Sequence, residues 1–266
     1  MVDSPWRPTL LIRATLLLHV VAVVVLLVSP MSWRLVLAGL FVNHLILMLL
    51  GLWPRSHWMG SNWTQLPAAA AVRHEIALTI DDGPDPLVTP QVLDVLARYG
   101  VHATFFVIGE RAERHPEVCR EIMRRGHAIE NHTQRHRHNF SLLGWRGIRQ
   151  ELKAAQSTLT AVTGQRPLFF RAPAGFRNPF LDPVLSQLGL QLASWSVRGF
   201  DTHVSNSAKV KTKLLAGLRP GAIVLLHDGN AARTPTGTPV ILDVLPALLD
   251  AAAASNLRWV TLRQAR

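Results

Sequence analysis

Leu78-Thr79-Ile80-Asp81-Asp82-Gly83-Pro84 is the stretch of this chain that decides the fold. Its first residues complete an apolar and β-branched run, which predicts a buried strand over residues 75–80. Two adjacent carboxylates and a Gly-Pro turn end this strand. Buried carboxylates are costly unless a metal ion or a catalytic role compensates them. An ordinary aspartate-stabilised turn is the alternative, and the pair alone favours function only slightly.

Short apolar runs and amphipathic stretches alternate through the rest of the chain. We expect further strands at 103–108, 127–130, 168–170, 191–197, 222–226 and 258–261. We expect helices between them at 90–99, 116–125, 147–163, 181–188, 208–218 and 239–254. Strict strand–helix alternation indicates an α/β fold with a mostly parallel sheet. About seven such units favour a barrel, closed or incomplete, over an open sheet.

Polar side chains follow five of these strands. They are Asp81 and Asp82 after the first strand, His132 after the third, Arg171 after the fourth, Asp201 after the fifth and His227 after the sixth. In βα barrels the carboxyl ends of the strands meet at one rim, where the active sites lie. The sequence therefore predicts that these residues converge.

Asp82, His132 and His136 suit one divalent metal ion, with zinc as the first choice. Two imidazoles and one carboxylate leave coordination positions open, as in catalytic zinc sites. The His-x-x-x-His spacing places both rings on one side of a helical turn. A solvated basic loop is the alternative, because Arg135 and a third histidine, His138, share the segment. We regard His138 as the weaker candidate ligand.

Asp81, Arg171 and His227 are the candidate catalytic residues. A carboxylate beside the metal but not bound to it can take a proton from water, and Asp81 can play that part. Arg171 could hold Asp81 through a charge-assisted hydrogen bond, or form a purely structural ion pair. His227 ends a buried strand and suits a general acid, although a hydrogen-bonded core histidine is the alternative.

Two apolar segments, residues 10–28 and 35–52, open the chain. Each has about the length needed to cross ~30 Å of hydrocarbon. A turn with a proline and a tryptophan separates them, and Trp53, Trp58 and Trp63 follow the second segment, as at a membrane interface. We interpret the pair as a transmembrane hairpin. A cleaved signal peptide and a buried helical hairpin are the alternatives.

The composition restricts the partners. The 266 residues carry a formal net charge of +11, yet the basic residues are scattered and form no nucleic-acid-binding signature. With a membrane segment present, anionic lipid or an anionic substrate is favoured over nucleic acid. The single cysteine, Cys119, excludes an internal disulfide and is expected in the core.

Four ordered motifs resemble those of the polysaccharide deacetylases, the NodB-homology enzymes of carbohydrate esterase family 4. They are Thr79-Ile80-Asp81-Asp82-Gly83-Pro84, His132-Thr133-Gln134-Arg135-His136, Arg171-Ala172-Pro173-Ala174-Gly175 and Leu225-Leu226-His227. The resemblance implies a distorted (β/α)7 barrel and metal-dependent hydrolysis of N-acetyl groups on amino sugars. It assigns Asp81 as base, Asp82, His132 and His136 as ligands, Arg171 as the residue that tunes the base, and His227 as acid.

Residues 195–202 depart from the family pattern. The family often has Asp-x-x-Asp-Trp here, whose first Asp orients the catalytic histidine and whose Trp lines the acyl pocket. This chain has Arg198 and Thr202 at those two positions, and only Asp201 remains. Arg198 is a candidate contact for an anionic substrate group, or a plain surface arginine. The substrate-binding residues that we expect are Pro173, Ala174, Trp195, Arg198 and Asp201.

We therefore expect a membrane hairpin over residues 1–56, a linker over 57–71 and a deacetylase domain over 72–266. The expected activity is metal-dependent N-deacetylation of an amino sugar in a lipid-linked or cell-envelope glycan. One alternative is a deformylase acting on a polyprenyl-phosphate-linked amino sugar. Another is a catalytically silent glycan-binding membrane protein. The sequence specifies no oligomeric state.

The distribution of arginines predicts the orientation of the hairpin in the bacterial inner membrane. Arg7 and Arg13 flank its start, Arg55 and Arg73 follow it, and only Arg34 lies in the connecting turn. Positive residues favour the cytoplasm, so we expect both ends, and the catalytic domain, at the cytoplasmic face. The resemblance favours the opposite face, because many family members act on polymers outside the cytoplasm.

Overall fold

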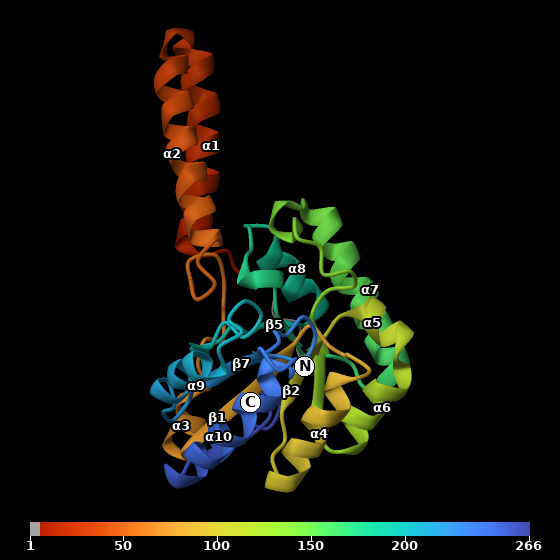
Figure 1. Cartoon of the computed structure of the whole chain (residues 1–266). Helices are drawn as coiled ribbons and strands as arrows, with labels where there is room; N and C mark the ends of the chain where they lie inside the picture. The colour runs from red at the N-terminus through yellow and green to blue at the C-terminus, as the bar shows by residue number, and fades with distance from the viewer. Residues whose placement is uncertain (1–5) are drawn as a thin grey trace.

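The computed structural model describes residues 6–266, and it consists of a long helical hairpin and an α/β domain (Figure 1). The hairpin is formed by α1 (Leu10–Val28) and α2 (Trp33–Gly51), joined by the short η1 (Pro30–Ser32). Both helices are long and apolar enough to cross a membrane, a property that spans share with signal sequences. The two expected apolar helices are thus present, and residues 1–5 of the expected hairpin unit lie outside the described residues.

Polar contacts join the two hairpin helices. The Thr15 hydroxyl donates to Oδ1 of Asn43 at 3.0 Å. The rings of His19 and His44 meet edge to face, with centroids 5.3 Å apart. Because lipid removes the hydrophobic drive for helices to associate, such polar pairs and close packing hold a hairpin together.

The strands of the α/β domain are all parallel, in the order β5-β4-β3-β2-β1-β7-β6, with β8 paired to the start of β1. Their bounds are β1 (Glu75–Asp81), β2 (Thr104–Val107), β3 (Ala128–Asn131), β4 (Phe169–Phe170), β5 (Gln191–Leu192), β6 (Val197–Arg198), β7 (Ile223–His227) and β8 (Arg258–Trp259). The central β1 is buried along its whole length, which explains its continuous apolar run. The expected α/β fold with an incomplete parallel barrel is confirmed.

Helices cover the outer side of this curved sheet (Figure 1). They are α3 (Ala68–Val72), α4 (Val88–Tyr99), α5 (Gly109–Arg114), α6 (Pro116–Arg124), α7 (Trp145–Thr163), α8 (Leu181–Leu188), α9 (Ser207–Ala216) and α10 (Val240–Ala254). Short 3-10 turns occur at η2 (Phe140–Leu142) and η3 (Pro173–Gly175). Gly100, Gly164 and Gly189 cap α4, α7 and α8 in the left-handed conformation that favours glycine.

The barrel is open between β5 and β6, where the sequence predicted one strand over 191–197. These two strands instead lie at opposite edges of the sheet, and residues 193–196 cross the opening. Trp63 fills part of this opening, which we call the seam. Its backbone N–H donates to the Leu192 carbonyl, and its backbone carbonyl accepts from the Ser194 N–H. Leu66 is buried in the same core and donates to the Gly221 carbonyl beside β7. Residues of the expected linker therefore form part of the barrel wall.

Candidate active site

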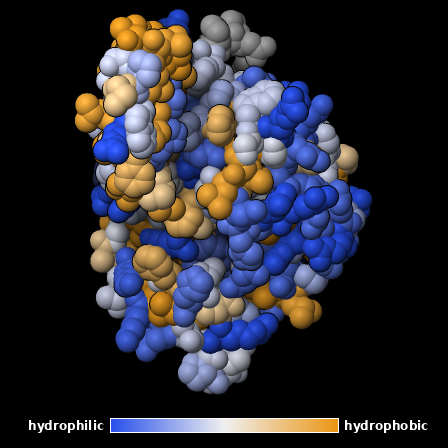
Figure 2. All heavy atoms as spheres, turned by 90° about the horizontal axis from the view of Figure 1, so that it is seen from above, coloured by the Kyte–Doolittle hydropathy of each residue, from blue (hydrophilic) through white to orange (hydrophobic). Residues whose placement is uncertain are grey.

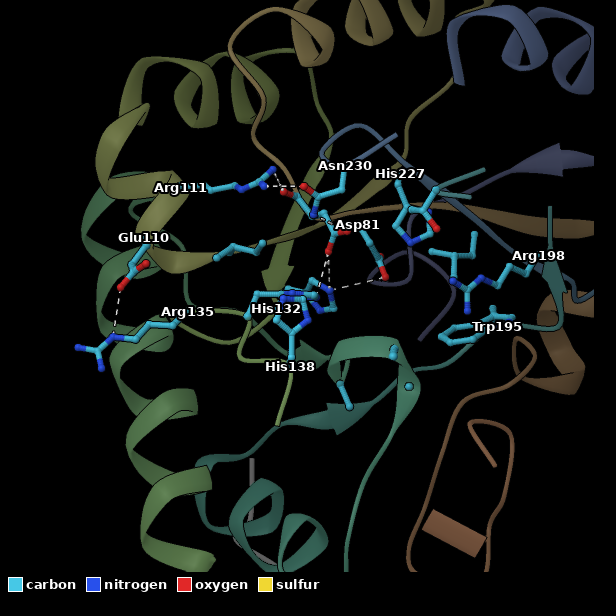
Figure 3. Close-up of a pocket in the computed structure, with 18 of the residues that line it drawn as sticks. Asp81, Glu110, Arg111, His132, Arg135, His138, Trp195, Arg198, His227 and Asn230 are labelled. Atoms are coloured by element: carbon cyan, nitrogen blue, oxygen red, sulfur yellow. Dashed lines mark hydrogen bonds and ion pairs between the residues drawn. The ribbon is translucent and has the colours of Figure 1, made fainter. Parts of the chain in front are cut away.

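The carboxyl ends of the strands bring the predicted residues to one rim, around a cavity of about 560 Å³ (Figure 3). Asp81 is the last residue of β1 and lies in register with His227, the last residue of β7. His132 directly follows β3, and Arg171 directly follows β4. Residues that are far apart along the chain thus face one space because their strands are neighbours.

Asp82, His132 and His136 form a compact cluster. Nε2 of each histidine lies 3.2 Å from Oδ1 of Asp82, and the three potential ligand atoms lie within 4.8 Å of one another. Asp82 and His136 adopt positive φ angles of 71° and 48°, an uncommon conformation for residues other than glycine. His138 lines the same cavity but lies outside the cluster.

The hydrogen bonds of His132 test whether a cation fits this cluster. Its Nδ1 lies 2.8 Å from the Arg171 carbonyl, which can only accept, so Nδ1 carries the hydrogen. In the neutral ring, Nε2 is then a bare acceptor that faces the acceptor Oδ1 of Asp82. A cation between the two atoms, either a metal ion or a second proton on the His132 ring, removes this repulsion. The donor set and its orientation therefore fit a divalent metal ion.

The protonation states of the cluster agree with this fit. Burial alone would raise the pKa of Asp82, but the surrounding histidines, His132 first and then His227 and His136, outweigh burial and lower that pKa below the usual range. Burial lowers the pKa of His136 to about 4. At neutral pH the cluster thus contains an ionised carboxylate and an uncharged His136 ring, the forms in which these side chains bind metals.

Arg171 fixes Asp81 from beneath the cavity. The guanidinium is fully buried, and Nη1 donates to Oδ1 of Asp81 at 2.6 Å and to the Thr79 hydroxyl at 2.8 Å. Its other donors bind the carbonyls of Ala193 and Ser194. The second carboxylate oxygen of Asp81 faces the cluster, 4.0 Å from Nε2 of His132. Asp81 therefore lies beside the potential metal ligands with one oxygen free.

Asp201 holds His227, and this differs from our expectation that Asp201 contacts substrate. Asp201 is fully buried behind His227, and it does not line the cavity. It accepts from the His227 backbone N–H at 2.7 Å, and its other oxygen lies 3.0 Å from Nδ1 of His227. Burial alone would lower the pKa of His227, but the nearby carboxylates, Asp201 first and then Asp81 and Asp82, outweigh burial and raise it.

The wall opposite the cluster contains Trp195 and Arg198 (Figure 3), and Ala174 also lines the cavity. Pro173, which we also expected at the substrate, is buried and does not line the cavity. The Arg198 guanidinium stacks between the rings of Trp195 and Phe200, at 5.2 and 4.9 Å from their centroids. Within residues 6–266 its side chain makes no hydrogen bond or ion pair, and its Nε is buried without a partner.

Sequence reasoning missed two residues that hold Asp82. Arg111 donates to the Asp82 carbonyl at 2.7 Å and to Oδ1 of Asn230 at 2.9 Å. The Asn230 amide donates to Oδ2 of Asp82 at 3.1 Å. A polar turn three residues after His227 was a usable signal for Asn230. No local signal pointed to Arg111, because its role depends on how α5 lies against the β1 turn.

Comparison with known proteins places this site in a family. A family model described as polysaccharide deacetylase matches residues 69–193. A chitooligosaccharide deacetylase of Sinorhizobium fredii is 38% identical over 62% of this chain and 76% of its own length. A peptidoglycan-N-acetylglucosamine deacetylase of Bacillus cereus is 34% identical over 65% of this chain and 81% of its own length.

Solved structures agree. The Bc1960 peptidoglycan N-acetylglucosamine deacetylase matches with a TM-score of 0.68 and 29% identity, over 76% of this chain and 91% of that one. The peptidoglycan deacetylase PdaC of Bacillus subtilis matches with a TM-score of 0.63 and 29% identity, over 72% and 89%. The chain therefore belongs to the polysaccharide deacetylase family, the NodB-homology hydrolases of carbohydrate esterase family 4.

Proposed function

We propose that this protein removes the acetyl group from an N-acetylated amino sugar in a cell-envelope or lipid-linked glycan. One observation carries the proposal: Asp81 and His227 face one cavity, on which the Asp82–His132–His136 cluster also opens. The relatives act on chitooligosaccharides and on the N-acetylglucosamine of peptidoglycan. We assign Asp82, His132 and His136 as ligands of one divalent metal ion, with zinc as the first choice.

The chemistry of the chain's own residues follows from their geometry. A divalent ion bound there supplies Lewis acidity, which lowers the pKa of water and polarises the acyl carbonyl. Asp81 accepts the proton of the attacking water through its free oxygen, while Arg171 holds the carboxylate in place. His227 donates to Asp201 through Nδ1, so its Nε2 carries the second proton to the leaving amine. Water and the amide thus give acetate and a free amino sugar.

A deformylase is the second candidate, favoured by one observation. Thr202, at the position where the family often has a tryptophan, lines the cavity. A smaller residue there changes the acyl pocket, so the acyl group is the point to test. The silent glycan-binding alternative is less favoured, because binding alone does not require the oriented pairs Arg171–Asp81 and Asp201–His227.

The acyl group is tested with the purified full-length protein, supplied with zinc. Chitooligosaccharides, peptidoglycan fragments and a polyprenyl-phosphate-linked formamido sugar serve as substrates, with mass spectrometry of the glycan and assays for acetate and formate. We expect acetate and a glycan that is lighter by one acetyl group. Formate alone would establish the deformylase, and no release from any substrate would favour the silent protein.

We further propose that the hairpin is an anchor in the bacterial inner membrane and that the catalytic domain, which includes part of the expected linker, lies at the cytoplasmic face. The arginines on either side of the hairpin support this orientation. A C-terminal GFP fusion of the full chain should therefore fluoresce. An active C-terminal alkaline phosphatase fusion, together with a non-fluorescent GFP fusion, would show that the domain lies on the other face of the membrane.

The ligand assignment predicts a specific pattern of metal loss. His132→Ala, His136→Ala and the double variant should lose the bound divalent metal, because each removes an imidazole from the cluster. His138→Ala should retain it and serves as the matched control. Metal content is measured by mass spectrometry of the purified proteins. Stoichiometric metal in the double variant would show that the ligands are elsewhere.

The acid and base assignments predict a loss of turnover without a loss of metal. Asp81→Asn and His227→Ala should each lower kcat by about 10²–10⁴-fold, the usual contribution of a positioned proton-transfer group. Deacetylation rates and metal content are measured on the same preparations. Near-normal turnover in either variant would reject that residue's role.

Asp201 should set the alkaline limit of activity. Its carboxylate raises the pKa of His227, so the protonated acid persists to higher pH than an ordinary histidine. In Asp201→Asn the pKa should fall, and the alkaline limb of kcat/KM should move to lower pH. Asp243→Asn, on α10 and away from the cavity lining, is the control. An unmoved limb would mean that Asp201 does not act through His227.

Arg198 should bind an anionic group of the substrate. An unpaired guanidinium at a cavity wall favours a phosphate or carboxylate partner. Arg198→Ala should therefore raise KM more for a phosphorylated amino sugar than for its neutral counterpart, by about tenfold, as for one charged hydrogen bond. Arg198→Lys should recover part of the loss. An equal rise in KM for both substrates would show that Arg198 does not bind the anionic group.

A further inference from the structure

The start of α8 is attached to both domain-side ends of the hairpin. The Arg177 N–H donates to the carbonyl of Gly51, the last residue of α2, at 3.1 Å. The Trp6 indole, just before α1, donates to Asp182 at the start of α8 at 2.7 Å. Residues 177–182 thus lie at the level where both hairpin helices leave their apolar segments.

Two apolar side chains are exposed at this level. Phe180 lies between the two attachment points and is 49% exposed. The Asn178 amide donates to the carbonyls of Ser141 and Leu143, which fastens the η2 turn beside it. Leu142, in that turn, is 82% exposed. Figure 1 shows the turn before α7 rising on the hairpin side of the domain, and Figure 2 shows apolar atoms among hydrophilic ones on this face.

The outer face of α7 continues this surface with cationic side chains. Trp145, Arg146, Arg149 and Lys153 line a shallow groove, and the Arg149 guanidinium lies 5.7 Å from the Trp145 ring. No ion pair involves these three basic residues in the part of the chain that the structure describes. The acidic residue of the helix, Glu151, is buried on the other side.

We propose that these residues form a docking surface for anionic phospholipid headgroups of the bilayer that holds the hairpin. The surface is defined by Leu142, Trp145, Arg146, Arg149, Lys153 and Phe180. Aromatic and aliphatic side chains suit the headgroup–acyl boundary, and arginine and lysine suit anionic headgroups. The proposal rests on the proposed function in one respect, that the hairpin spans a membrane.

Docking would hold the cavity beside the headgroups. Gly175 packs against Pro54, which follows α2, and its φ of 75° and the nearby Trp195 leave no space for a side chain. Its neighbour Ala174 lines the cavity. One short loop thus joins the base of the hairpin to the cavity wall. A glycan carried by a lipid in the same leaflet would meet the site without leaving the membrane surface.

The test uses single cysteines in the full-length protein, reconstituted in nanodiscs. Leu142→Cys and Val72→Cys form a matched pair, because the two side chains are 82% and 81% exposed. Val72 is the control, because it precedes the amino end of β1, whereas the cavity lies at the carboxyl end of that strand. Val24→Cys, within α1, reports insertion of the hairpin. Cys119 can stay, because it is buried and burial raises the pKa of its thiol to about 12. Each cysteine carries a polarity-sensitive fluorophore, and nitroxide-labelled lipids act as quenchers.

We expect quenching at positions 142 and 24 in phosphatidylglycerol-containing nanodiscs, and none at 72. The variant Arg146→Gln/Arg149→Gln/Lys153→Gln should reduce the docked population by about tenfold or more, as should zwitterionic lipid. Its thermal unfolding and its acetate release from soluble chitooligosaccharide should be unchanged, which separates docking from the proposed chemistry.

Three results would overturn the proposal. Quenching at 24 with none at 142 would reject docking, and quenching at 142 that ignores lipid charge and the triple variant would reject the anionic headgroup as partner. No quenching at 24 would remove the membrane anchor on which docking rests. If the labelled protein with an intact docking surface docks normally but releases no acetate, the result would instead count against the proposed function.

Discussion

The buried guanidinium of Arg171 connects more of this molecule than any other group at the site. It donates to Asp81 and Thr79 on β1 and to two carbonyls of the seam, and its own carbonyl orients His132. The ring of Phe106 lies 4.1 Å beneath it. An unpaired buried charge costs several kcal/mol, and breaking such a pair typically costs about 3–5 kcal/mol. The same contacts thus hold the sheet and the Asp81 carboxylate.

Local chemistry explains which features the sequence predicts. Short apolar runs and amphipathic stretches depend on near neighbours, and they predicted most strands and helices. The convergence of Asp82, His132 and His136 followed from parallel topology. The division of the predicted strand 191–197 did not, because it depends on Trp63 entering from a distant part of the chain. The role of Arg111 was hidden for the same reason.

At residues 198–202 the structure places the contact with the histidine on a residue other than the one the resemblance implied. The resemblance assigned orientation of the histidine to the position that Arg198 occupies. Here Asp201 performs it, with one oxygen on the His227 backbone and the other on its ring. Two contacts from one fully buried carboxylate fix both the backbone and the side chain of His227. Position 198 is thereby free to present a cation to the cavity, while the His227 ring stays held by Asp201.

The seam gives the hairpin a second significance. Trp63 and Leu66 complete the barrel wall at the seam. The backbone of Trp63 is hydrogen-bonded to β5 at Leu192, and that of Leu66 to Gly221 just before β7. A chimera that keeps residues 72–266 and replaces everything before them would therefore lose part of the barrel wall. Recombination that respects this architecture has to cross before residue 63. The hairpin and the barrel of this chain are therefore expected to be inherited together.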